Sequence, residues 1–173
     1  MKRVSEYTEG VRHYLLASEL LNSTNYRFKS LENHLLKAYQ HNFHNVEQML
    51  ISLYRQHKMY REAIYWFRKY DAYSDIELVL DVAMWYEKGM GTDINYDEAA
   101  KMYIRIAFRS NIAILRLISL YKDNKIQQIG NSPKNNNIEY WIELMKSKLK
   151  REYFGIKHKS TYPIYSTLFN KNL

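Results

Sequence analysis

Residues 86–107 read YEKGMGTDINYDEAAKMYIRIA, and this stretch decides the expected fold. It consists of two segments with helical character joined by the connection Gly89-Met-Gly91. Ala99 is followed three and four positions later by two large residues, so a small residue and two large ones share one face of a helix. The stretch therefore predicts a pair of amphipathic helices that approach closely at a small residue.

The same pattern recurs elsewhere in the chain. Ala63 lies 36 positions before Ala99 and is followed by an aromatic pair at the same spacing. Tyr54, Tyr86 and Tyr121 occupy the packing position of successive first helices and are expected in the core. Extending the period outward predicts helices over residues 4–22, 26–40, 43–56, 60–71, 75–89, 95–108, 111–123 and 136–153. The sequence thus predicts an all-α fold, an α-solenoid of about four antiparallel helix pairs.

The 86–107 stretch resembles the Sel-one-like repeat, a relative of the tetratricopeptide repeat in which a Gly-x-Gly turn joins the two helices. The spacing from the tyrosine through the glycine pair to Ala99 is kept, with Asn95 where Asp is usual and Met102 where Trp is usual. The unit around Ala63 lacks the glycine pair and is closer to the plain tetratricopeptide spacing. The resemblance implies a tetratricopeptide-like superhelix whose concave surface holds a peptide or helix of a protein partner.

We expect two regions, a helical-repeat domain over residues 1–155 and a basic, aromatic C-terminal tail over residues 156–173. Gly155 is predicted to stop the last helix, and Pro163 to keep Tyr162 out of helical geometry. The tail contains apolar residues that need to be buried. It either caps the last repeat or docks on a partner chain, and the sequence leaves both alternatives open.

The composition excludes several classes of protein. The 173 residues contain no Cys, which removes disulfide frameworks, thiolate zinc sites, iron–sulfur clusters and thiol nucleophiles. The most apolar stretch, residues 112–121, is interrupted by Arg116 and is too short to span a bilayer. We therefore expect a cytoplasmic protein with no membrane span. The preference for Lys, Ile, Asn and Tyr is typical of a low-GC genome, which leaves a virus particle open as the location.

The sequence gives little support for a catalytic or metal-binding site. His41 and His44 with Glu47 could share an ion, but no third Cys or His stands at ligand spacing, so no metal is expected. Glu77 and Asp81 are four positions apart, which suits a solvated helix face better than acid–base catalysis. The sequence shows no pattern that indicates a Ser/His/Asp catalytic triad. We expect no enzymatic activity and no cofactor.

In a tetratricopeptide-like array the first helix of each pair lines the concave surface, so its inward positions are the candidate partner-binding residues. They are Asn45, Gln48, Ser52 and Arg55 in one unit, Leu80, Met84 and Lys88 in the next, and Leu115, Ser119 and Lys122 in the third. The apolar middle suits a partner's hydrophobic anchors, and the cations suit acidic side chains or a C-terminal carboxylate. The alternative is that Leu80 and Leu115 pack against neighbouring helices.

The net charge of +8 is concentrated at the C-terminal end, where residues 144–173 hold seven Lys and Arg against one Glu. Lys148, Lys150, Arg151, Lys157 and Lys159 form a candidate basic docking end for nucleic acid or an acidic protein. The alternative is a solvated last helix whose cations suit its C-terminus. We expect a protein–protein interaction adaptor or assembly scaffold, with a nucleic-acid-associated or particle-structural protein as the alternative. The oligomeric state is left open.

Overall fold

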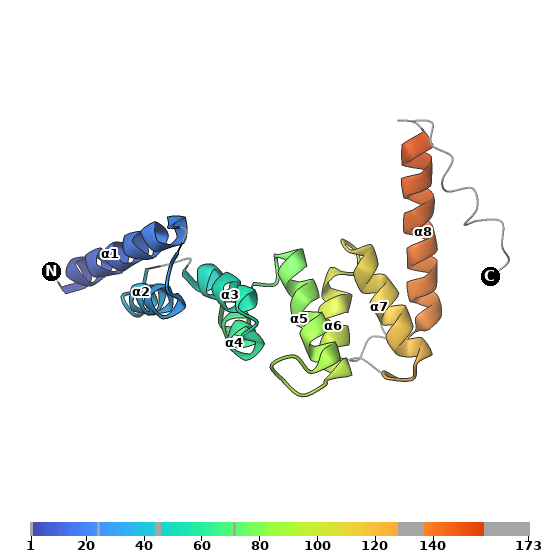
Figure 1. Ribbon diagram of the computed structural model, residues 1–173. Helices are drawn as coiled ribbons and strands as arrows, with labels where there is room; N and C mark the ends of the chain where they lie inside the picture. Colours follow the sequence, from blue (N-terminus) through green and yellow to red (C-terminus); the bar gives the residue numbers. More distant parts are fainter. Residues whose placement is uncertain (1, 24, 44–45, 71, 128–136, 158–173) are drawn as a thin grey trace. The chain divides into compact units, whose positions relative to one another are not determined.

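The computed structural model describes residues 2–23, 25–43, 46–70, 72–127 and 137–157, with side chains described from residue 7 to residue 151 (Figure 1). The helices are α1 (Lys2–Asn22), α2 (Phe28–Gln40), α3 (Val46–Gln56), α4 (Tyr60–Tyr70), α5 (Ile76–Lys88), α6 (Tyr96–Ile106), α7 (Asn111–Lys122) and α8 (Ile138–Lys157). These described ranges contain no strand, so the all-α class is confirmed. Every predicted helix is present, and every helix end lies within four residues of its prediction.

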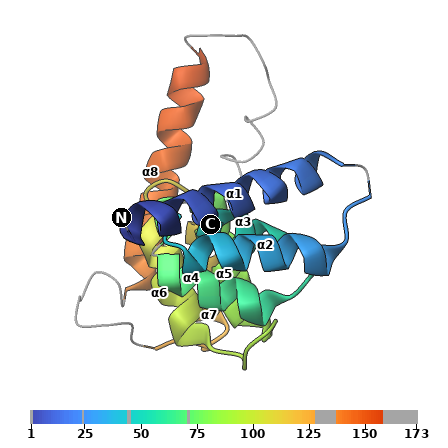
Figure 2. The same cartoon turned by 90° about the vertical axis from the view of Figure 1, so that its left-hand side faces the viewer.

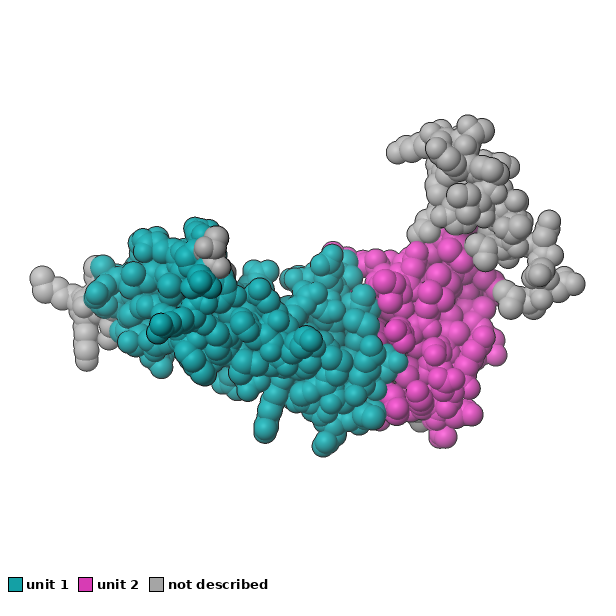
Figure 3. All heavy atoms as spheres, viewed as in Figure 1, with its two compact units in different colours: residues 1–95 teal, residues 96–173 magenta. Residues whose placement is uncertain are grey.

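The chain forms two compact units, residues 1–95 with α1 to α5 and residues 96–173 with α6 to α8 (Figure 3). In the first unit α1 packs on α2, α2 on α3 and α3 on α4, and two perpendicular views show α1 and α2 side by side (Figures 1 and 2). In the second unit α7 packs against both α6 and α8. Packing between neighbours in the chain fits a helical repeat, while a superhelix over both units stays a prediction.

The core is built on the faces that the repeat predicts. Ala63 and Phe67 in α4, and Ala99 and Tyr103 in α6, are all fully buried. Each of the nine alanines in the chain is buried; they are Ala17, Ala38, Ala63, Ala72, Ala83, Ala99, Ala100, Ala107 and Ala113. Seven of them lie in helices, where the small side chain of alanine allows neighbouring helices to approach closely; Ala72 and Ala107 lie in the connections.

The three tyrosines of the repeat do not behave alike. Tyr54 and Tyr86 are buried as predicted, each 3% exposed, whereas Tyr121 is only half-buried. The turns that follow these tyrosines also differ in register. The residue with left-handed backbone comes four positions after Tyr54, at Lys58, but three positions after Tyr86 and Tyr121. Tyr54 is therefore not strictly equivalent to the other two.

Four helices end in the same hydrogen-bonded turn, the Schellman motif. Its left-handed residues are Asn42 after α2, Lys58 after α3, Gly89 after α5 and Asn124 after α7. The next residue in each turn donates its N–H to the carbonyl five positions back, namely Phe43 to Ala38, Met59 to Tyr54, Met90 to Trp85 and Lys125 to Leu120, at 2.8–3.0 Å. The motif pairs carbonyls that would otherwise be left open at a helix end. A common local turn thus ends one helix and directs the chain into the next.

Gly91 is required by a contact as well as by its backbone. Its φ of +72° is left-handed, and a Cβ at this position would stand 2.7 Å from the carbonyl carbon of Tyr60 and closer still to the backbone nitrogen of Arg61. The loop after α5 therefore lies directly on the first turn of α4. The sequence indicated the left-handed backbone but not this contact.

The end of α8 corrects one prediction. The helix continues through Gly155 to Lys157, so Gly155 does not stop it. Glycine weakens a helix interior by only about 1 kcal/mol, which neighbouring turns can offset. The remainder of the tail, residues 158–173, and the predicted insertion at residues 128–136 lie outside the described residues. Among the helices that the structure describes, none is both long and apolar enough to cross a membrane.

The two glycines provide a matched pair of substitutions. Gly89→Ala pays the left-handed backbone penalty, roughly 1–2 kcal/mol, because the nearest atom to its new Cβ is the flexible side chain of Ile94 at 3.0 Å. Gly91→Ala adds a clash with the α4 backbone, so it should lower the free energy of unfolding further. Urea denaturation of both variants measures the difference. Equal losses would contradict the backbone contact.

The buried small residue of α6 gives a second prediction. Ala99→Trp should overpack the core and lower the free energy of unfolding by roughly 1–3 kcal/mol or more, because Ala99 is fully buried. Asp97→Trp, at an exposed position of the same helix, is the control and should change stability by less than about 1 kcal/mol. Thermal melting of the two variants tests this. An unchanged melting temperature for Ala99→Trp would mean that the assigned register is wrong.

Candidate functional site

The predicted partner-binding residues of α3 lie at the surface of the first unit. Gln48, Ser52 and Arg55 are exposed on one face of the helix, and Asn45 lies outside the described residues. Gln48 and Ser52 also line a hollow of about 270 Å³. Its remaining walls are mostly apolar and come from α1, α2 and α3, with Leu21, Leu31, Leu35, Met49, Leu53 and Gln56. The structure thus joins two of the predicted residues to a concavity.

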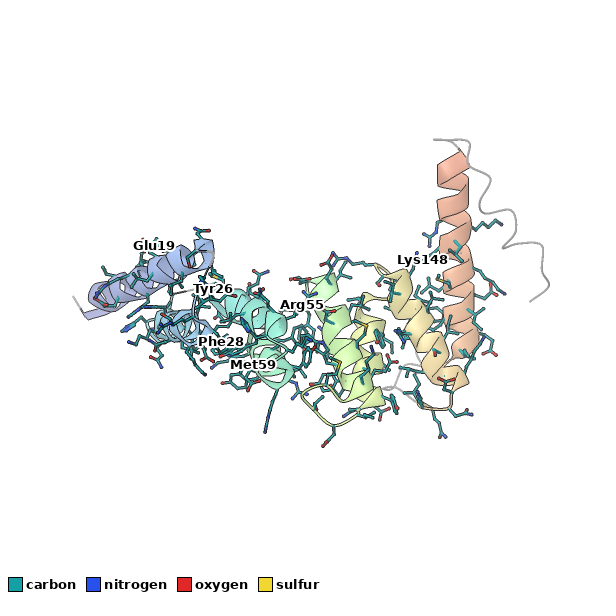
Figure 4. All side chains as sticks on the ribbon, in the orientation of Figure 1. Glu19, Tyr26, Phe28, Arg55, Met59 and Lys148 are labelled. Carbon is teal, nitrogen blue, oxygen red and sulfur yellow. The ribbon has the colours of Figure 1, made fainter. Side chains whose placement is uncertain are left out.

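Arg55 has a structural partner. It forms an ion pair with Asp81 at 2.5 Å, which links α3 to α5 (Figure 4). Burial raises the pKa of the Asp81 carboxyl, and the Arg55 guanidinium acts in the opposite direction. Asp81 is therefore half-buried and paired rather than solvated beside Glu77, which corrects the sequence interpretation. The charge of Arg55 is largely matched inside the first unit.

The two leucines of the predicted apolar middle differ in exposure. Leu80 is half-buried, as is Met84, while Lys88 is exposed. Leu115 is 52% exposed, so most of its side chain does not pack against a neighbouring helix. Ile112, one turn earlier on α7, is 53% exposed. We call the exposed stripe Ile112, Leu115, Ser119 and Lys122 the α7 face.

The candidate basic end is only partly available for binding. Lys148 is half-buried and donates a hydrogen bond to the carbonyl of Ala107 at 3.2 Å, which ties α8 to the turn between α6 and α7 (Figure 4). Lys150 and Arg151 are exposed. The side chain of Lys157, and Lys159 as a whole, lie outside the described residues.

A pocket beside α4 went unnoticed in the sequence. One wall is a single face of that helix, formed by Arg61, Ile64, Tyr65, Arg68 and Lys69. Tyr86, Gly91 and Thr92 complete the lining, and the volume is about 580 Å³. We call it the α4 pocket. The sequence does contain a signal for it, because Arg68 and Lys69 lie seven and eight positions after Arg61. This spacing places all three on one face of a helix.

Lys69 is held in an aromatic surround at the edge of the α4 pocket. Its Nζ lies 4.6 Å from the ring centroid of Tyr39, 5.1 Å from that of Trp66 and 5.4 Å from that of Tyr65. It also donates a hydrogen bond to the Tyr65 hydroxyl at 3.3 Å. Hydrogen bonding to Tyr39 and Tyr65 raises the pKa of the ammonium group, so Lys69 stays charged at neutral pH.

Three histidines meet where α1 and α2 pack. The Nδ1 atoms of His13 and His34 are 2.9 Å apart, and the His41 ring stacks on His13 with centroids 6.3 Å apart. A hydrogen bond between the two Nδ1 atoms requires one imidazole to donate and the other to accept, so at least one ring of the pair is neutral. Across the described residues no three His, Asp or Glu side chains are placed to hold a metal ion, and His44 lies outside them.

Comparisons with family models, with curated proteins and with solved structures find no match to this chain. The resemblance to Sel-one-like repeats consequently rests on the residues of the 86–107 stretch alone.

The histidine pair predicts a pH dependence of stability. Burial, then His34, then Lys37 lower the pKa of His13 below its ordinary value of 6.5, while Glu9 opposes the shift. The unfolded chain therefore binds more protons, and stability falls as the pH drops below about 6.5. The melting temperature should decrease between about pH 7.5 and pH 5.5.

Two variants isolate this effect. His34→Gln removes the like charge and should flatten the pH dependence, whereas His57→Gln, at an exposed histidine of the same unit, should leave it as in the parent. Melting curves recorded across the pH range test both. If the melting temperature of His34→Gln changed with pH as steeply as that of the parent, the pH dependence would not come from the His13–His34 pair.

Proposed function

We propose that the protein is a non-enzymatic protein–protein interaction adaptor or assembly scaffold, and that the α7 face anchors its partner. The observation that supports this is the exposure of large apolar side chains on a well-formed helix. Ile112 and Leu115 are each more than half exposed, and Phe108, in the turn just before α7, is 65% exposed. Leaving such groups in water is unfavourable, and burying them against a partner removes that cost.

The chemistry of the α7 face favours an acidic amphipathic helix as the partner. The stripe changes from apolar at Ile112 and Leu115 to polar and basic at Ser119 and Lys122. The second unit, residues 96–173, contains fourteen Lys and Arg against six Asp and Glu. A partner with apolar anchors at helical spacing and carboxylates beside them complements both features.

The hollow beside Gln48 and Ser52 extends the proposal to the first unit. Its apolar walls could receive a further side chain of an extended partner. The hollow is thus a second candidate contact that lies within the first unit alone.

Selection of a random helical-peptide library against the full chain tests the proposal. Selected peptides should combine apolar residues at helical spacing with Asp and Glu. Leu115→Glu should weaken their binding at least about tenfold, because it places a charge in the apolar contact. Ser74→Glu, at an exposed position of the first unit, is the matched control and should bind like the parent. Equal binding by Leu115→Glu would exclude the α7 face.

Nucleic-acid binding is the second candidate, and one observation favours it. Residues 1–95 contain twelve Lys and Arg against twelve Asp and Glu, so the whole net charge of +8 lies in residues 96–173. Charge-driven binding weakens steeply with salt, whereas apolar contacts do not. Anisotropy titrations with a labelled single-stranded RNA at two salt concentrations separate the candidates. Tight, steeply salt-dependent binding that Lys150→Gln/Arg151→Gln abolishes would favour the nucleic-acid function.

A further inference from the structure

The α4 pocket is an open pocket on the surface of the first unit. Its volume of about 580 Å³ lies in the range typical of ligand pockets, roughly 300–1,000 Å³. Every lining residue belongs to the first unit, so the pocket does not depend on the second. At the rim of the pocket, the backbone of Gly91 lies so close to the first turn of α4 that no Cβ fits between them. The α5–α6 loop is thereby held in place as one wall.

The charge of the pocket is not a general property of its surroundings. The first unit is formally neutral, yet Arg61, Arg68 and Lys69 all line this one pocket. Among the described residues, no Asp or Glu lines the pocket. Within those residues, none of the three cations forms an ion pair with a carboxylate. Arg55, by contrast, is matched by Asp81. Three cations gathered where no described acid lines the pocket favour a multiply charged anion.

The three cations lie on one face of α4. Arg61 and Arg68 are seven residues apart, about 10 Å along α4, so their long side chains can converge from both ends of the pocket. The Arg68 guanidinium lies 5.5 Å from the Tyr86 ring centroid, and Lys69 is held by three rings and the Tyr65 hydroxyl. Side chains that are already restrained lose less entropy when a ligand binds.

A phosphoryl group matches this arrangement better than a carboxylate. It carries about −1.5 to −2 charges at neutral pH and three acceptor oxygens, whereas a carboxylate carries one charge. Guanidinium groups form bidentate hydrogen bonds with phosphate. The apolar part of the lining consists of Ile64, Tyr86 and the ring of Tyr65, which is 56% exposed, and it suits an aromatic ring attached to the phosphoryl group.

We propose that the α4 pocket binds a phosphotyrosine side chain of a protein partner. The phosphoryl group lies among Arg61, Arg68 and Lys69, and the ring packs against Tyr65 and Ile64. This inference rests on the proposed adaptor function in one respect, namely that a protein partner carries the phosphoryl group. The site would make partner binding dependent on tyrosine phosphorylation.

Fluorescence anisotropy with the full chain tests the proposal. The probes are a short labelled peptide with one phosphotyrosine, its unphosphorylated form and its phosphoserine form, with adenosine monophosphate and inorganic phosphate as competitors. The phosphotyrosine peptide should bind at least about tenfold more tightly than the unphosphorylated peptide, because a charged hydrogen-bonded contact is worth about a factor of ten or more. It should also bind more tightly than the phosphoserine peptide, which lacks the ring that packs against Tyr65 and Ile64. Neither small competitor should displace it at equal concentration.

Variants then assign the binding to the pocket. Arg61→Gln/Arg68→Gln should weaken phosphotyrosine binding about tenfold or more, and Arg12→Gln, at an exposed cation of α1, should not. Lys69→Gln changes an exposed side chain and provides the same test if the double variant fails to fold. Leu115→Glu should bind the phosphotyrosine peptide like the parent, because Leu115 does not line the α4 pocket. The test of the α4 pocket is therefore independent of the test of the α7 face.

Three results would overturn the proposal. The first is equal binding of the phosphorylated and unphosphorylated peptides, and the second is unchanged binding in Lys69→Gln. In the third, adenosine monophosphate binds more tightly than the peptide, which would identify a nucleotide site instead.

Discussion

The close approach of neighbouring helices at alanine is the constraint on which the remaining structure depends. All nine alanines are buried, and in α4 and α6 the alanine lies on the same face as the large side chains that fill the core. A larger residue at these positions would push the helices apart, and the interior would lose contacts that dispersion and burial make favourable. Helices that pack on their neighbours in the chain follow directly from this repeated small residue.

Packing one stripe of each helix leaves the opposite stripe available for function. On α4 the buried stripe carries Ala63 and Phe67, and the outer stripe carries the three cations of the α4 pocket. On α7 the outer stripe begins with Ile112 and Leu115, which are apolar although they face water. The two units therefore present different chemistry, a pocket lined by three cations in a neutral unit and an apolar-to-basic face in a positively charged one.

The two proposals are consistent with a single kind of protein. An adaptor that holds a partner helix on one unit and recognises a modified side chain on the other would gain affinity from both contacts, because the second contact forms at high effective concentration. Neither contact needs a catalytic group. Both use side chains that the core leaves at the surface.

The sequence by itself determined the helices, the repeated buried face and the left-handed glycine pair, because these depend on residues at most a few turns apart. It also identified Leu115 as a surface candidate, although it could not decide between exposure and packing. The pairing of Arg55 with Asp81, the contact of Gly91 with α4 and the meeting of His13 with His34 appear only in the tertiary structure. Helical periodicity shows which face of a helix is buried but not which residues of a distant helix lie opposite it. For that reason the cations of α4 became a candidate site only when the structure placed Tyr86 and the loop at Gly91 and Thr92 beside them.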